Sequence, residues 1–250
     1  GLVVHGAAVE RNGSAAILAG ASHAGKTTLS GWLAGRGWGV LSDELVIVDP
    51  ADGSLRGFPR PLGVRRGGPL SSVIAGNGVG RDRWSDEAVD EVAVPVSSLG
   101  AVVAAARPVV VALVERADRT AVEEVARAEA LQSLSEHTLE RPGGRLVSFV
   151  EAAELVGATR TVRLQVADLD QAHALLADLV DDAGPGRGVR GGEVAGPTSI
   201  GPAGPIPVVW SGVSPAMVTA EYDDGAVVLD VSTGDRRILN VSAAIVWRLM

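Results

Sequence analysis

The feature that most constrains this 250-residue chain is its only lysine, Lys26, which lies in the octet Gly20-Ala21-Ser22-His23-Ala24-Gly25-Lys26-Thr27. The octet fits the pattern G-x-x-x-x-G-K-[ST], a glycine-rich loop whose backbone N–H groups cradle phosphates. Of the 22 basic residues, all except Lys26 are arginines. Because lysine is a compact charge on a flexible stem and arginine a wide planar fork, we interpret the one retained lysine as a phosphate ligand.

The sequence on both sides of the octet supplies the structural context that this loop needs. Residues 14–19 are an apolar run that predicts a strand, and residues 28–34 predict a helix. A strand, a glycine loop and a helix N-terminus together form an anion site. In that site Lys26 is expected to reach the β- and γ-phosphates of ATP, and the Thr27 hydroxyl to bind Mg²⁺. The plain alternative is a glycine-rich turn with a solvated lysine.

The stretch expected to bind the nucleotide extends one residue beyond the octet. It comprises Gly20, Ala21, Ser22, His23, Ala24, Gly25, Lys26, Thr27 and Thr28. His23 lies in the variable part of the motif, so we expect its ring to pack against the protein or face solvent.

The composition excludes several classes of protein. A net charge of −8 argues against nucleic acid or an anionic membrane as the main partner. The chain has no cysteine, so it cannot form disulfides or thiolate metal sites. Its most apolar stretch, 101–114, is interrupted by Arg107-Pro108 and is too short to span a bilayer. We therefore expect a cytoplasmic protein, for which a homo-oligomer is compatible with the sequence. An apolar start without methionine and an end inside a predicted helix indicate a fragment.

Periodicity predicts an alternation of strands and helices, and hence an α/β fold. The predicted strands are 14–19, 40–41, 45–48, 109–114 and 162–166, and the predicted helices are 28–34, 123–139, 145–156 and 168–180. Residues 66–91 have little periodicity and are predicted to be loop. Residues 183–205 are dominated by Gly and Pro, which is typical of a linker. We therefore expect three parts: a P-loop domain at 1–182, the linker at 183–205 and a second domain at 206–250.

Two adjacent acids, Asp43 and Glu44, lie between the predicted strands 40–41 and 45–48. Acids at a strand end beside a nucleotide site suit Mg²⁺ binding, and one of them could accept a proton from an attacking hydroxyl. Adjacent residues of an extended chain point to opposite faces, so the two acids are expected to differ in role. The alternative is a solvated acidic turn.

The N-terminal part of the chain resembles the catalytic domain of HPr serine kinase/phosphorylase. The resemblance is carried by His5-Gly6, by the octet, and by the passage from Arg36-Gly37-Trp38-Gly39 to Asp43-Glu44. It spans about residues 1–182 and is specific around 5–45. It implies the mixed-sheet nucleotide-binding fold shared with phosphoenolpyruvate carboxykinase, and ATP-dependent phosphoryl transfer to a protein hydroxyl. It also places His5 near the transferred phosphate and gives Asp43 and Glu44 metal-binding and base roles. Read alone, His5 would be a hydrogen-bonded core histidine.

One signature of that family is altered here. Members with both activities carry Glu-x-Arg-Gly-Leu-Gly, whereas this chain has Phe58-Pro59-Arg60-Pro61-Leu62-Gly63 without the glutamate. The altered form resembles divergent relatives found with peptide-modification systems. The missing glutamate argues against phosphorylase activity, and with it against HPr as substrate. Arg60 and Arg65 are candidates for holding substrate or phosphate. In a chain this rich in arginine, structural or solvated roles are equally compatible.

The C-terminal segment predicts a β-hairpin, 217–221 and 226–230, followed by a short edge strand at 237–240 and a helix at 241–249. Asn240 is the expected N-cap of the helix. Its apolar stripe would be Ala244, Ile245, Trp247 and Leu249. The segment resembles the start of a PqqD-type peptide-recognition domain, a winged-helix-like α+β module. In that family a leader peptide adds as a strand to the sheet edge. The alternative is an ordinary hairpin with a packed helix.

Together these patterns predict an ATP- and Mg²⁺-dependent serine/threonine kinase. Its substrate would be a ribosomally made precursor peptide or small protein recruited by the PqqD-like module. Two other functions stay open from the sequence. One is an ATP-gated peptide chaperone without phosphoryl transfer, and the other is a regulatory kinase of the carrier protein HPr.

Overall fold

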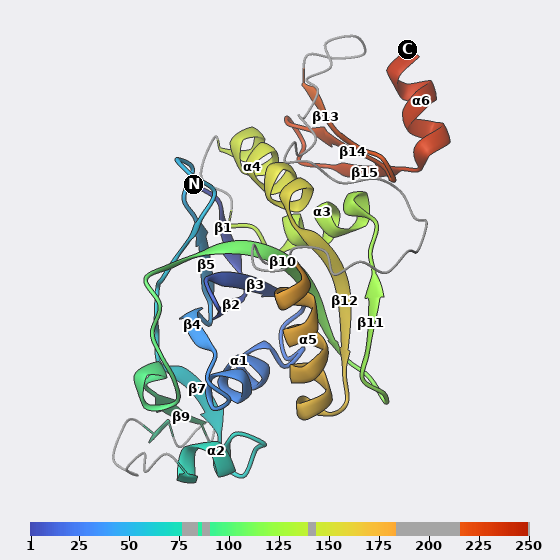
Figure 1. Cartoon of the computed structure of the whole chain (residues 1–250). Coiled ribbons are helices and arrows are strands. Elements are labelled where there is room, and N and C mark those ends of the chain that lie inside the picture. Colours follow the sequence, from blue (N-terminus) through green and yellow to red (C-terminus); the bar gives the residue numbers. More distant parts are fainter. Residues whose placement is uncertain (77–84, 87–90, 140–143, 184–215, 250) are drawn as a thin grey trace.

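In the computed structural model, the described residues are 1–76, 85–86, 91–139, 144–183 and 216–249. They form a mixed α/β fold around a nine-stranded sheet (Figure 1). Seven of its strands follow the order β1-β5-β6-β10-β3-β2-β4, with β12 pairing β10 and β11 pairing β12. The β10–β3 and β10–β12 pairs are parallel, and the other pairs are antiparallel. The predicted α/β class with a mixed sheet is thus confirmed.

The nine strands of this sheet are β1 (Val3–His5), β2 (Ala7–Arg11), β3 (Ser14–Ala19), β4 (Gly39–Ser42), β5 (Leu45–Val48), β6 (Leu55–Arg56), β10 (Ala105–Arg116), β11 (Ala121–Glu124) and β12 (Arg160–Val166). The helices packed on it are α1 (Lys26–Ala34), α3 (Arg127–Glu136), α4 (Arg145–Ala158) and α5 (Leu169–Ala183).

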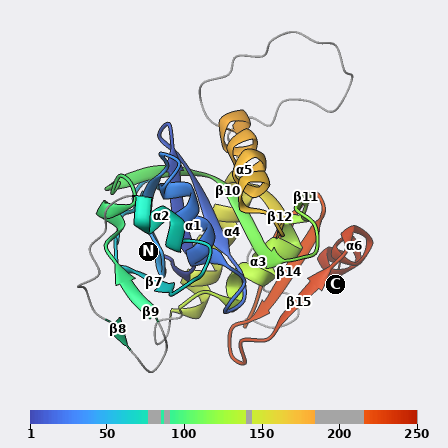
Figure 2. The same cartoon turned by 90° about the horizontal axis from the view of Figure 1, so that it is seen from below.

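Strand β3 lies between two helical layers, which explains its uninterrupted apolar sequence. Its alternate residues Ala15, Ile17 and Ala19 belong to the core cluster that includes residues of α3 and α4. Ala16 and Leu18, which point to the opposite face, pack with residues of α1 and α5. The described chain is therefore layered, with helices on both faces of the sheet, and the view from below shows the same arrangement (Figure 2). A strand buried on both faces reads as a continuous apolar run.

A second, smaller sheet lies beside α1 and corrects one sequence prediction. It consists of β7 (Leu62–Arg65), β9 (Glu91–Val94) and β8 (Ser85–Asp86), in the order β7-β9-β8, and a short helix, α2 (Ser71–Gly76), follows β7. The prediction of a loop over 66–91 is thus wrong where α2 and β8 lie, although residues 77–84 and 87–90 are outside the described residues. Leu62, Val64 and Leu70 share a core cluster with Ala34 of α1. This tertiary burial supports structure that the local sequence does not predict.

The helix predicted over 123–139 is shorter in the structure. Glu123 and Glu124 belong to β11, which pairs with β12, and α3 begins only at Arg127. The pairing explains the difference, because Val122 packs against the core while Glu123 and Glu124 are exposed. A Glu- and Ala-rich composition favours a helix, but Glu123 and Glu124 form a strand because they pair with the edge of β12.

The C-terminal strands pack on the helical layer of α3 and α4. They are β13 (Met217–Tyr222), β14 (Gly225–Asp230) and β15 (Arg236–Leu239), which pair antiparallel in that order. Val218, Val227 and Leu229 belong to the same core cluster as Phe149 of α4. The Tyr222 hydroxyl donates to the Ala153 carbonyl at 3.1 Å. The predicted hairpin and edge strand are confirmed.

Helix α6 (Val241–Leu249) follows β15, and its predicted N-cap is confirmed. The Asn240 side-chain oxygen accepts a hydrogen bond from the Ala243 N–H at 2.9 Å. The predicted apolar stripe is only partly correct. Ala244 is buried, and the Trp247 ring donates to the Thr219 hydroxyl, whereas Ile245 and Leu249 are exposed. The helix therefore contacts its sheet along a narrower line than the periodicity predicts.

Most of the predicted linker at 183–205 lies outside the described residues, as do residues 206–215 at the start of the predicted second domain. Only Ala183 is described, as the last residue of α5. Among the helices of the described part of the chain, none has the length and apolar character needed to cross a bilayer.

Candidate functional site

The glycine-rich loop connects the end of β3 to the start of α1, as the sequence predicts. Gly20 has φ +150° and Gly25 has φ +101°, conformations that L side chains rarely adopt. A Cβ at Gly20 would lie 2.5 Å from the Val114 carbonyl oxygen of β10. Only glycine therefore allows the loop to start this close to the neighbouring strand. His23 also has a positive φ, +65°, and is exposed, which agrees with the second of the two positions expected for it, packed against the protein or facing solvent.

Lys26 is folded into the loop instead of extending into solvent. Its side chain is only 8% exposed, and its ammonium group donates to the carbonyl oxygens of Gly20 at 2.8 Å and Ala21 at 3.0 Å. Burial lowers the pKa of Lys26, and the nearby charge of Asp43 acts in the opposite direction. The ammonium group is therefore held at the start of α1, where the phosphates of a nucleotide are expected.

Asp43 lies in the turn between β4 and β5 and packs against the first turns of α1. It is 7% exposed, and the Ser30 hydroxyl donates to its Oδ1 at 2.6 Å, with a further hydrogen bond from Thr27. Burial raises the pKa of Asp43 to about 6, although these two hydroxyls and Lys26 favour the charged form. A carboxyl group with a pKa near neutrality can accept and release protons at physiological pH.

Glu44 has a different environment from its neighbour, as the alternation of the chain predicts. Its side chain is exposed and forms an ion pair with Arg60. The structure thus places Arg60 against the predicted metal ligand Glu44. To bind a metal ion, Glu44 would have to release Arg60.

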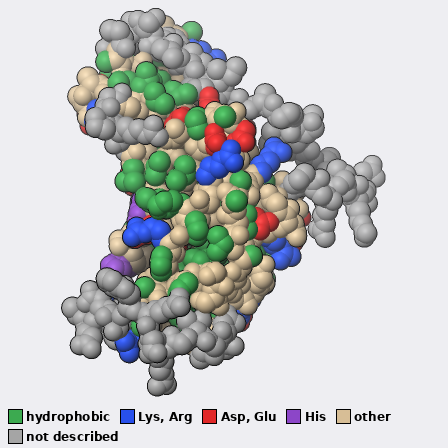
Figure 3. Space-filling model, turned by 90° about the vertical axis from the view of Figure 1, so that its left-hand side faces the viewer, with side chains coloured by type: hydrophobic (Ala, Val, Ile, Leu, Met, Phe, Trp, Pro, Cys, Tyr) green, Lys and Arg blue, Asp and Glu red, His purple; other side chains and the backbone are tan. Residues whose placement is uncertain are grey.

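A pocket of about 570 Å³ joins most of the predicted site residues. The predicted residues that line it are His5, Ser22, His23, Gly25, Lys26, Thr27, Thr28, Asp43, Glu44 and Arg65. Gly20, Ala21, Ala24 and Arg60 are not among its lining residues. His5 reaches the pocket from the end of β1, where its backbone N–H donates to the His137 carbonyl at 2.7 Å. Histidine and basic side chains lie close together on one face of the molecule (Figure 3).

Two further residues of the site are not identified by the sequence analysis. Ser30 follows Thr27 by three positions on α1, so the helical spacing alone could have placed its hydroxyl beside that of Thr27. Arg116, the last residue of β10, also lines the pocket. Its position follows from the parallel pairing of β10 with β3, which a single sequence does not show.

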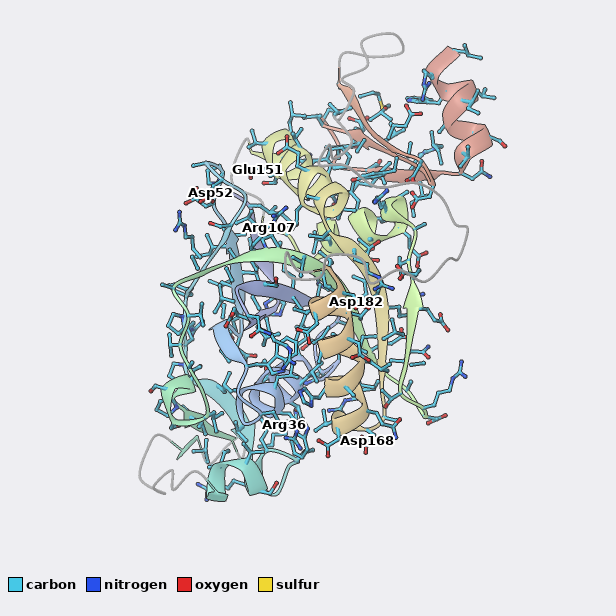
Figure 4. All side chains as sticks on the ribbon, in the orientation of Figure 1. Arg36, Asp52, Arg107, Glu151, Asp168 and Asp182 are labelled. Carbon is cyan, nitrogen blue, oxygen red and sulfur yellow. The ribbon has the colours of Figure 1, made fainter. Side chains whose placement is uncertain are left out.

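A larger cavity, about 840 Å³, lies elsewhere and contains none of the predicted site residues. It is bordered by Arg107 at the start of β10, by Asp182 near the end of α5 and by Asp223 in the β13–β14 turn. Arg107 and Asp182 are labelled in Figure 4, which also shows Arg36 and Asp168 at the opposite end of α5. Asp223 is already paired with Arg127, so part of the charge in this cavity is neutralised within the protein.

The donors at the pocket fit a magnesium ion that shares its coordination with phosphates. The Thr27 hydroxyl and the carboxylates of Asp43 and Glu44 are hard oxygen ligands of the kind Mg²⁺ prefers. Within the described residues, no three His, Asp or Glu side chains converge as a complete metal site. Mg²⁺ commonly uses one or two carboxylates together with substrate phosphates and water, so this arrangement suits a metal that arrives with the nucleotide.

Known proteins are similar to this chain in structure and not in sequence. No family model and no curated protein sequence matches the chain. Among solved structures, the chain is similar to the HPr(Ser) kinase/phosphatase from Coxiella burnetii, with 12% identity and a TM-score of 0.37. The similarity covers 72% of this chain and 94% of that one.

Proposed function

We propose that this protein is an ATP-dependent kinase that transfers a phosphoryl group to a hydroxyl of a peptide or small protein. The observation that carries the proposal is the placement of Lys26 and Asp43 in one pocket, both nearly buried, at the start of α1. Loop amides and an ammonium group bind phosphates, and a carboxylate beside them can take the proton of an acceptor.

The chemical step divides between these residues. The acceptor hydroxyl oxygen forms a bond to the γ-phosphorus, its proton passes to a carboxylate, and the bond from the γ-phosphorus to the bridging oxygen of ADP breaks. Asp43 suits the proton transfer because its pKa is about 6. Lys26 offsets negative charge on the phosphates, and the Thr27 hydroxyl with Glu44 is available to a metal ion. A magnesium ion held by Thr27 and Glu44 would supply positive charge that offsets the negative charge of the phosphates.

The C-terminal sheet supports a peptide as the acceptor. Within the described residues β15 pairs only with β14, so its other edge has no strand partner there. Ile238 of β15 is exposed on this sheet. An extended peptide that pairs with such an edge gains main-chain hydrogen bonds, and tethering would raise its concentration near the kinase site. We therefore propose a ribosomally made precursor peptide as the substrate.

Incubation of the protein with γ-labelled ATP, Mg²⁺ and a precursor peptide encoded beside its gene tests this function. Label on the peptide is expected from the wild-type protein. Asp43→Asn should reduce transfer by roughly 100-fold or more, the size typical of a lost general base, while peptide binding persists. Glu44→Gln keeps Asp43 and is expected to reduce transfer less.

The other outcomes separate the remaining functions. ATP-dependent peptide binding by the wild-type protein without any transfer would identify an adaptor or chaperone and overturn the kinase proposal. Transfer that survives in Asp43→Asn but not in Glu44→Gln would exchange the roles assigned to the two acids.

A further inference from the structure

Arg116 lies at the edge of the sheet where the glycine-rich loop begins. Strand β10 ends at Arg116 and runs parallel to β3, with Leu113 opposite Ala19. The carboxyl ends of these two strands therefore lie together, which is where ligands bind in open α/β sheets. Arg116 lies three residues beyond Leu113, the last residue of β10 that pairs with β3, and it lines the same pocket as the loop.

The guanidinium group of Arg116 is directed at the N-terminus of α1. A Cβ placed on Gly25, the N-cap of α1, would lie 3.9 Å from the Arg116 Nε, and no other atom would lie within 4 Å of it. Arg116 also lines the pocket together with Lys26 and Thr27. The guanidinium thus faces the same space as the loop amides that start the helix.

Arg116 differs from several other arginines of the described chain because no carboxylate among the described residues pairs with it. Among the described residues its guanidinium forms no hydrogen bond or ion pair, and its side chain is exposed. By contrast, Arg60 pairs with Glu44, which lines the same pocket, and Arg163 pairs with Glu129. An arginine fork without an acidic partner, beside helix N-terminal amides, is suited to phosphate oxygens.

We propose that Arg116 is a phosphate-binding residue of this site that contacts the β- and γ-phosphates of the nucleotide. This inference rests on the proposed function. Lys26 contributes one compact charge from inside the loop, and Arg116 adds a planar donor from the neighbouring strand. A cation supplied from within the chain offsets the charge that develops on the transferring phosphoryl group.

Equilibrium titration of the full chain with Mg·ATP, Mg·ADP and AMP tests the inference. Arg116→Ala is expected to weaken ATP and ADP binding by about tenfold to a hundredfold, the range for lost charge-assisted hydrogen bonds, and to leave AMP binding unchanged. Arg116→Lys, which keeps the charge but loses the fork, should fall in between. The matched control is Arg119→Ala, which removes the same charge from an exposed position outside the pocket.

Each outcome decides a different point. Equal ATP affinity of the wild-type protein and Arg116→Ala would overturn the role of Arg116 and leave the kinase proposal intact. An equally large loss of ATP affinity in Arg119→Ala would show that the effect comes from the net charge of the protein, and this would also overturn the role of Arg116. Wild-type protein that binds ATP through Arg116 but transfers no phosphoryl group would contradict the kinase proposal alone. No nucleotide binding by the wild-type protein would overturn both.

Discussion

At the scale of single residues, Asp43 shows how a requirement of the site works against the stability of the fold. Its carboxyl group is almost completely buried, and burial raises its pKa to about 6. A raised pKa means that the folded protein holds this proton more tightly than the unfolded chain does. Ionisation of Asp43 at neutral pH is therefore unfavourable in the folded state, although Ser30 and Thr27 offset part of the cost.

We therefore expect Asp43→Asn to stabilise the metal-free protein at pH 7 by about 2–3 kcal/mol, although it reduces transfer. The gain should shrink as the pH falls from about 6 towards 4, because Asp43 becomes protonated in the folded state over this range. Urea unfolding of both proteins at several pH values without Mg²⁺ measures this gain in the free energy of unfolding. A variant that is less stable than the wild type at pH 7 would contradict the assigned burial cost.

Ser30 makes a second prediction at this scale, because its hydroxyl donates to the Asp43 carboxylate and favours the charged form. In Ser30→Ala the pKa of Asp43 should rise further, so the acidic limb of the pH profile of kcat/KM should move to higher pH. Ser30→Thr keeps the hydroxyl and serves as the matched control. An unchanged pH profile of kcat/KM in Ser30→Ala would contradict the role of Ser30 in setting the pKa of Asp43.

At the scale of elements, the loop between β3 and α1 depends on the contact that β3 makes with β10. Gly20 begins the loop where a Cβ would lie 2.5 Å from the Val114 carbonyl oxygen. The loop pattern predicts a glycine at this position, but the reason for it is supplied by a strand that lies more than ninety residues further along the chain. The turn between β2 and β3 offers a comparison, because Gly13 also has a positive φ, +82°, but open space around it.

Gly20→Ala is expected to destabilise the protein by about 2–4 kcal/mol and to remove nucleotide binding, since either the loop or β10 must shift. Gly13→Ala should cost only about 1–2 kcal/mol, the price of a left-handed backbone for a residue with a Cβ, and should keep ATP affinity. Thermal unfolding and ATP titration of both variants provide the comparison. Equal losses of stability and ATP affinity in the two variants would show that the close contact between position 20 and Val114 does not limit the loop.

At the scale of the whole molecule, the C-terminal sheet and the helices α3 and α4 bury each other. Residues of β13 and β14 share a core cluster with α3 and α4. Asp224, in the turn between β13 and β14, accepts a hydrogen bond from the Arg127 N–H at the start of α3. The sequence predicts a second domain after a linker. That residues 1–182 form a separate domain stays a prediction. The shared core leads us to expect strong coupling in stability.

A chain shortened to end at residue 183 should therefore melt well below the full chain, because apolar surface on α3 and α4 becomes exposed. Tyr222→Phe is a milder matched change, which removes only the hydrogen bond to Ala153 and should cost about 1 kcal/mol. Both are read by thermal unfolding. A shortened chain with unchanged stability would show that the two parts fold independently.

The sequence by itself determined the local parts of this protein. It predicts the loop, the helix that starts at it, the buried strands and the N-cap Asn240, since each depends on residues that are close along the chain. It also predicts Lys26, Asp43 and Glu44 as candidate site residues, which the structure brings to one pocket.

Only the tertiary structure decided which distant elements meet. The parallel pairing of β10 with β3 puts Arg116 at the loop, and the edge of β12 turns Glu123 and Glu124 into strand. Burial against α1 separates Asp43 from the exposed Glu44. The physical reason is that strand pairing and burial depend on contacts between residues far apart in the chain, which local propensity does not encode.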